Sequence, residues 1–132
     1  MATVNLSNDP TQIITGKDNV AIRKVIATVP GGKALDVTNF APAVINSAHP
    51  IIMETATKEY KPMPLNAGAT AYAALPVGHV YAGALIASIL TTKAFAAIMT
   101  QGTINPEAAP YDFATIAAAF KAAMPLIGQQ AD

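Results

Sequence analysis

Proline and glycine constrain the folding of this chain more than any other feature of its sequence. Ten prolines and eight glycines are spread over 132 residues. Proline fixes φ and lacks an amide donor, and glycine readily adopts turn conformations. Pro42, Pro50 and Pro62 exclude a long helix from residues 41–63. The sequence therefore predicts short elements joined by tight turns.

The first half predicts strands. Residues 20–29 are rich in β-branched side chains, which favours a strand. Pro30-Gly31-Gly32 is a strong turn signal, and together with residues 33–40 it predicts a hairpin. Ile51-Ile52-Met53 is a short strand candidate, and residues 54–60 form a polar loop after it.

The second half predicts two core strands, at residues 80–90 and 94–100. Thr91-Thr92-Lys93 is short enough to join them as a hairpin. Residues 101–106 predict a turn that closes the second strand. A helical turn or two is expected around residues 69–74.

The last element predicts a helix. Asp112 is a plausible N-cap, and Pro125 stops the helix. Between them an apolar stripe recurs at spacings of three and four, as on one helix face. The expected fold class is α+β: a small, mostly-β domain of short strands with one C-terminal helix and an extended N-terminal arm over residues 1–10. The stripe consists of Phe113, Ile116, Ala117, Phe120 and Met124.

The balance of apolar and charged residues favours association. Apolar residues make up 52% of the chain, but alanine dominates them, so the core buries little area per residue. Only 12% of residues are charged, about half the usual share, and the formal net charge is zero. Such a surface is poorly protected against association. It suits a molecule covered by identical neighbours or by a shell.

Several classes of protein are not expected. The absence of cysteine excludes disulfide scaffolds and thiolate sites. The N-terminus shows no signal-peptide pattern, and the longest apolar stretch, residues 82–90, is too short for a membrane helix. We expect a soluble protein made in a cytoplasm, with no membrane partner. Arg23-Lys24 is the only basic pair, so no nucleic-acid partner is expected.

Residues that carry chemistry are scattered. His49 and His79 each adjoin turn residues, and neither has a partner at metal-ligand spacing. We expect each to be a surface or loop-edge histidine bonded to backbone. No Gly-x-Ser-x-Gly motif or phosphate-binding loop is present, and no metal, cofactor or catalytic set is predicted. The acidic side chains expected to be solvated are Asp36, Glu54, Glu59 and Glu107, and the serines are Ser7, Ser47 and Ser88.

Aromatic side chains are the candidates for an interface. All four tyrosines lie near breaks in the chain, and tyrosine is enriched at protein interfaces. The alternative is that each tyrosine caps the core with its hydroxyl in water. The tyrosines are Tyr60, Tyr72, Tyr81 and Tyr111, and the residues predicted for the interface are Tyr81, Tyr111, Phe113 and Phe120.

Residues 78–127 resemble the head fibre and head decoration proteins of tailed phages, most closely those of crAss-like phages. The shared pattern is a Tyr-x-Gly strand at Tyr81 and Gly83, an Ala-Ile-Met-Thr strand at residues 97–100, a Gly-Thr-Ile-Asn turn at residues 102–105, and a helix that ends in Pro-Leu-Ile at residues 125–127. The runs at residues 48–52 and 60–63 are also similar to the family.

The resemblance implies a non-enzymatic structural protein on the outside of a bacteriophage capsid. It implies a homotrimer, with the major capsid protein or other head proteins as partners, made in the host bacterial cytoplasm. Residues 1–40 are then a possible capsid-attachment region, and residues 41–132 a head fibre or decoration domain. An N-terminal polar arm can become ordered on a neighbouring capsid protein.

Two other functions remain as alternatives. A virion-associated hydrolase would use His79 or His49 with Glu54 or Glu107, and it needs these side chains within hydrogen-bond reach of each other. A receptor- or glycan-binding module at the virion surface would stack aromatic rings on sugar, although the chain has no tryptophan.

Overall fold

A computed structural model describes residues 2–4 and 16–131. Within them the chain is mostly β-sheet, with 38% strand and 14% helix, which confirms the predicted fold class. The predicted arm, apart from residues 2–4, lies outside the described residues. The elements are α1 (Asp18–Ala21), β1 (Ile22–Thr28), β2 (Lys33–Ala34), β3 (Val44–Ile45), β4 (Pro50–Glu54), β5 (Tyr60–Pro62), β6 (His79–Leu85), β7 (Ile89–Leu90), η1 (Thr91–Lys93), β8 (Phe95–Ala96), β9 (Ile98–Ile104), η2 (Pro106–Ala108), α2 (Ala117–Ala123) and β10 (Ile127–Gln129).

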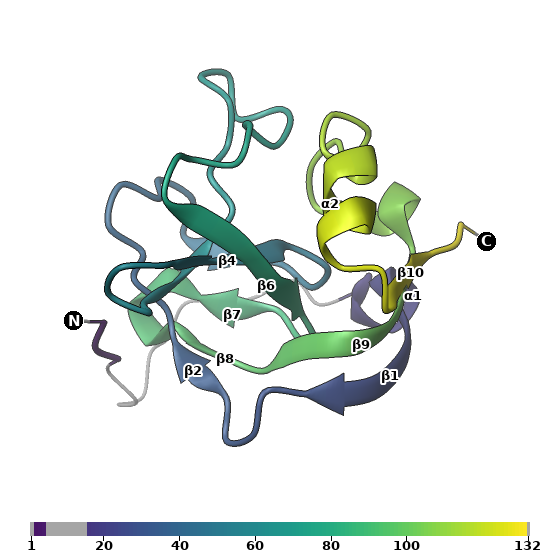
Figure 1. The fold of residues 1–132 in the computed structure, drawn as a ribbon, viewed down its shortest axis with the longest axis horizontal. Helices are drawn as coiled ribbons and strands as arrows, with labels where there is room; N and C mark the ends of the chain where they lie inside the picture. The colour runs from purple at the N-terminus through teal and green to yellow at the C-terminus, as the bar shows by residue number, and fades with distance from the viewer. Residues whose placement is uncertain (1, 5–15, 132) are drawn as a thin grey trace.

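The main sheet has the order β1-β9-β6-β4-β5, and β10 pairs with β9 in parallel. The other pairings in this sheet are antiparallel. Two small ribbons, β2–β8 and β3–β7, lie off this path (Figure 1). β1 therefore belongs to the same sheet as the strands of the second half, and the predicted regions 1–40 and 41–132 share one sheet.

The core lies on both faces of the main sheet. Successive strand residues point to opposite faces, and the two apolar clusters take alternate residues of the same strands. One cluster contains Phe120 of α2 and the other buried aromatic residues. The second cluster contains residues of the two small ribbons. The first cluster takes Ile52, Ala84 and Met99, and the second takes Ile51, Leu85 and Ile98.

The predicted hairpin after β1 is wrong. β1 pairs with β9, and β2 pairs with β8. The turn itself is present, with Gly31 and Gly32 at φ 76° and 70°. However, a Cβ on Gly32 would stand 2.7 Å from the Ala96 carbonyl oxygen, so the turn packs closely against β8. It carries the chain from the main sheet to a ribbon and does not fold β2 back onto β1.

The two predicted core strands are each divided. The first ends at Leu85, and after a bend the chain resumes as β7; the second is split into β8 and β9. Thr91–Lys93 is a 3-10 helix and does not form a tight hairpin. β6 and β9 pair with each other only through Ala84 and Leu85. The predicted turn at residues 101–106 is also wrong at its start, because β9 continues to Ile104.

The C-terminal helix is shorter than predicted. α2 begins at Ala117, with Ile116 as its N-cap and no side-chain cap. The Asp112 carboxylate accepts from the Ala114 amide (2.9 Å) in a local turn that precedes the helix. The predicted face is nevertheless the buried one, since Phe113, Ile116 and Phe120 lie in the core. Residues 69–74 contain no helix; Leu65 and Tyr72 form an isolated bridge there.

Candidate functional site

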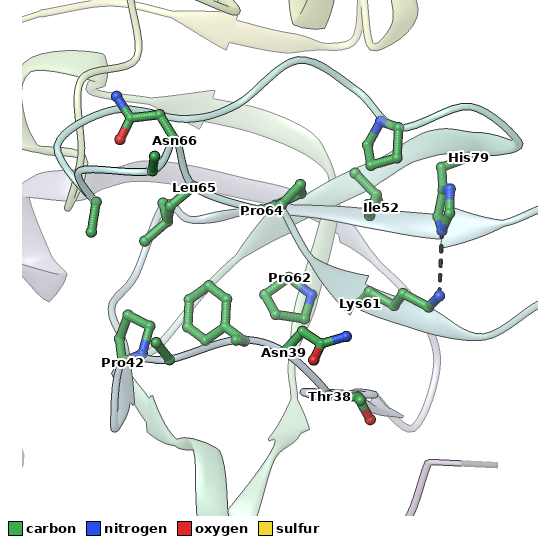
Figure 2. A pocket seen from close by; sticks show the side chains of 15 residues that line it. Thr38, Asn39, Pro42, Ile52, Lys61, Pro62, Pro64, Leu65, Asn66 and His79 are labelled. Atoms are coloured by element: carbon green, nitrogen blue, oxygen red, sulfur yellow. Dashed lines mark hydrogen bonds between the residues drawn. The ribbon is translucent and has the colours of Figure 1, made fainter.

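A pocket of about 370 Å³ opens between β4, β5 and the loops at residues 38–42 and 64–76 (Figure 2). Its volume falls at the low end of the range of roughly 300–1,000 Å³ that is typical of small-molecule sites. We name it the Phe40 pocket. It is lined by Thr38, Asn39, Phe40, Ala41, Pro42, Ile52, Lys61, Pro62, Pro64, Leu65, Asn66, Ala67, Ala69, Pro76 and His79.

Rigid side chains form the walls of the Phe40 pocket. Four of its lining residues are prolines, at positions 42, 62, 64 and 76. A proline ring has almost no side-chain freedom to lose, so these walls need little ordering when a ligand binds. Phe40 packs edge-on against the buried His49 ring, with the ring centroids 5.4 Å apart. The apolar part of the pocket is therefore preformed.

Charged groups gather at one end of the pocket. Lys61 Nζ lies 3.4 Å from His79 Nε2 and 3.7 Å from Glu54 Oε1 (Figure 2 shows the contact with His79). His79 Nδ1 lies 3.0 Å from the Val77 carbonyl oxygen, which can only accept. When the imidazole donates through Nδ1 to this carbonyl, Nε2 is left to accept from Lys61.

Carboxylates surround Lys61. Glu54 accepts a hydrogen bond from the Thr57 hydroxyl, and this bond together with the Lys61 ammonium lowers the pKa of the Glu54 carboxyl. Asp36 accepts from the Thr38 hydroxyl at 2.6 Å. That bond is the main reason why the pKa of Asp36 is lowered, and Lys61 adds to it. Lys61 and His79 line this end of the pocket. The two carboxylates act on Lys61 but do not line the pocket themselves.

An amide stands at the other end of the pocket. Asn66 Oδ1 accepts from the Thr70 backbone amide (3.0 Å), and Asn66 Nδ2 donates to the Thr70 hydroxyl (3.2 Å). These two bonds fix the plane of the Asn66 amide. The second N–H of this amide can then donate to a ligand. Asn39, which also lines the pocket, has φ 66°, a conformation that asparagine tolerates.

The residues predicted for an interface lie mostly inside the molecule. Phe113 and Phe120 are 2% and 0% exposed, so the core of the chain itself takes up both side chains. Tyr81 is 8% exposed and packs edge-on against Phe120, and its hydroxyl is buried without a hydrogen-bond partner. Tyr111 is half-buried beside Tyr72. Of the four, Tyr111 keeps the most surface for a partner.

The predicted position of His49 is wrong. It was expected at the surface or a loop edge, but it is 0% exposed, among the rings of Phe40, Tyr72 and Tyr111. The expected bond to backbone is present, from Nε2 to the Met63 carbonyl oxygen (2.9 Å). Burial lowers its pKa from 6.5 to about 4. For His79, the expected backbone bond at a loop edge is confirmed.

Of the histidine and glutamate pairs that a hydrolase would need, the structure brings one close together. Glu54 and His79 are cross-strand partners between β4 and β6. Lys61 stands between them and occupies the accepting nitrogen of His79. Glu107 is exposed on η2. Asp36, Glu54 and Lys61 come together only through the pairing of β4 with β5 and of Leu35 with Tyr60, so their spacing in the sequence gave no signal of it.

Residues 2–4 and 16–131 lack two further features that would have suggested a kind of site. They contain no group of three or more histidine, cysteine or acidic residues arranged to hold a metal ion. They also contain no helix that is long and apolar enough to span a membrane. Comparisons with protein-family models, curated proteins and solved structures gave no match to this chain.

Proposed function

We propose that this protein is a non-enzymatic structural subunit that binds the outside of a bacteriophage capsid, as a head fibre or decoration protein. The observation that carries the proposal is the bare surface of β1. Every side chain of this strand is at least partly exposed, and Val25 and Ile26 are 41% and 57% exposed. A partner that covers this strand would remove both large apolar side chains from water, which is favourable.

The position of β1 supports an interface. Among the described strands it pairs only with β9, so it forms one edge of the main sheet. Its pairing contains three register irregularities, which fit a strand that packs through its side chains better than one that extends the sheet. Contact through Val25 and Ile26 would remove apolar surface from water without requiring a new strand.

The small number of charged residues supports a trimer. Only 12% of residues are charged and the formal net charge is zero, so little charge repulsion opposes contact between identical subunits. A small domain of this kind gains stability when subunits bury further surface between them. The resemblance of residues 78–127 to phage head proteins supports the same assignment, with the major capsid protein as partner of the β1 surface.

Co-sedimentation with capsids tests the proposal. The protein is mixed with purified capsids of a crAss-like phage that lack their own head fibre protein, and the pellet is quantified. We expect the wild-type chain to pellet with the capsids and the Val25→Ser/Ile26→Ser variant to remain mostly in solution. Val77→Ser/Val80→Ser removes two exposed valines elsewhere, at 100% and 42% exposure, and serves as the control. A wild-type chain that stays monomeric at micromolar concentration and does not pellet would overturn the proposal.

A further inference from the structure

The geometry points to the Phe40 pocket as a binding site for a neutral saccharide of one or two rings. The site is independent of β1, because the sheet order places β4 and β5 at the edge opposite to β1. A chain attached to a shell through β1 would thus carry the pocket on another side.

The charge at the Lys61 end argues against an anionic ligand. The Lys61 ammonium is matched by Glu54 at 3.7 Å, and it also attracts the Asp36 carboxylate. Two carboxylates thus act on the single ammonium at this end, although neither of them lines the pocket itself. A carboxylate or phosphate group placed beside Lys61 would therefore be repelled by these nearby carboxylates as well as attracted by the ammonium.

The same groups argue against a cationic ligand. The Glu54 carboxylate already accepts from the Thr57 hydroxyl and pairs with Lys61. Asp36 likewise accepts from both the amide (3.1 Å) and the hydroxyl of Thr38. A ligand cation would compete with these donors and would stand beside the Lys61 ammonium.

Neutral hydroxyl groups fit this mixture of donors and acceptors. A hydroxyl both donates and accepts. Lys61 has three N–H donors, of which His79 and Glu54 take two. The second N–H of the Asn66 amide can serve the opposite end of a ligand. A polyhydroxylated ring can therefore bond to both ends of the pocket without adding charge.

The walls fit the apolar faces of a sugar ring. Phe40, Leu65 and the four lining prolines present C–H and ring surfaces. A pyranose ring has faces of C–H groups between its hydroxyls, and burying them removes apolar area from water. The chain lacks tryptophan, and Phe40 with the rigid proline rings lines the pocket in its place.

An NMR titration tests the inference. The ¹⁵N-labelled full chain is titrated separately with maltose, lactose and N,N′-diacetylchitobiose at millimolar concentration, and with inorganic phosphate and sodium octanoate as anionic probes. We expect at least one neutral disaccharide to shift the backbone amides of Asn39, Lys61 and Asn66, and we expect neither anion to do so. Lys61→Met, which keeps the aliphatic stem, should weaken that binding about tenfold.

Two tryptophan variants locate the binding. Ala41→Trp places a bulky ring at an exposed position that lines the pocket and should abolish the shifts. Ala122→Trp adds the same ring at an exposed position of α2 and should leave them unchanged. The inference is overturned if no neutral sugar shifts the pocket amides, if Ala41→Trp binds as well as wild type, or if only phosphate or octanoate binds. None of these results bears on attachment to capsids.

Discussion

Gly83 and Gly102 lie inside strands, where glycine is usually an unfavourable choice because it has no side chain to pack. Their φ angles are 153° and 156°, in the region that side chains rarely adopt. A Cβ on Gly83 would stand 2.2 Å from the Met99 carbonyl oxygen, and one on Gly102 would stand 2.2 Å from that of Lys24. Both sit beside register irregularities, so they let neighbouring backbones approach where the strands bulge.

Alanine at either position should therefore destabilise the fold. We expect Gly83→Ala and Gly102→Ala each to lower the free energy of unfolding by about 3 kcal/mol, from backbone strain and the clash with a carbonyl. Gly128→Ala is the control, because its added methyl would make only ordinary contacts, the nearest at 3.5 Å. Urea denaturation measures all three. Equal stabilities for the three variants would contradict this account.

His49 should make stability depend on pH. In the unfolded chain its pKa is near 6.5, and in the folded chain burial lowers it to about 4. Between these values the unfolded chain binds a proton that the folded chain does not, so stability falls as pH decreases through this window. A difference of about 2.5 pKa units corresponds to a loss of about 3 kcal/mol by pH 4.

Urea denaturation at a series of pH values measures this loss. His49→Gln keeps a donor for the Met63 carbonyl oxygen and should flatten the profile between pH 6.5 and 4. His79→Gln serves as the control and should keep the wild-type profile. The carboxyls of Asp36 and Glu54 have lowered pKa values, so their contributions are lost at the acidic end, as the pH falls from their ordinary values through the lowered ones. A wild-type profile that is flat across the window would refute the role of His49.

At the scale of elements, Asp18 joins three segments that are distant in the sequence. Its Oδ1 accepts from the hydroxyls of Ser47 (3.1 Å) and Ser88 (2.7 Å), and its Oδ2 accepts from the Ser88 amide (3.0 Å). Ser88 Oγ in turn accepts from the Ser47 amide (3.1 Å). The start of α1 is thus tied to the segment before β4 and to the bend between β6 and β7.

Removing this carboxylate should loosen the link. We expect Asp18→Asn to lower the free energy of unfolding by about 2 kcal/mol, since hydrogen bonds to a charged group are the stronger ones. The effects of Asp18→Asn and Ser88→Ala should be far from additive, because both remove the same bonds. Asp112→Asn, which disturbs only a local turn, is the control. Additive effects in a double-mutant cycle by chemical denaturation would contradict the shared network.

Local pattern predicted these elements better than it predicted their pairing. The strand at Ile51-Ile52-Met53, the strand after residue 20 and the buried face of the C-terminal helix follow from residue type and periodicity. The break at Ser88 does not, because it depends on Asp18, which is 70 residues away. The prediction of a hairpin after Pro30 failed for the same kind of reason, since β2 finds its partner in β8.

At the scale of the whole molecule, the Phe40 pocket also could not be predicted from local sequence pattern. Its prolines are visible in the sequence, yet Phe40, Lys61 and His79 meet only after β4 pairs with both β5 and β6. The exposure of β1 was likewise not visible, because its β-branched residues are equally typical of a buried strand. Composition alone, with few charges and much alanine, indicated association without locating the surface.

If the folded chain forms the proposed trimer, its stability should depend on protein concentration. Subunits that bind one another only when folded raise the midpoint of unfolding by mass action. We expect the Tm of the wild-type chain to rise by several degrees for each tenfold increase in concentration. Val25→Ser/Ile26→Ser changes only the surface assigned to the capsid protein, so this variant and Val77→Ser/Val80→Ser should both keep the dependence. Thermal melts followed by circular dichroism, with light scattering to count subunits, measure both effects. A wild-type Tm that stays constant across the micromolar range would rule out a trimer that stabilises this fold.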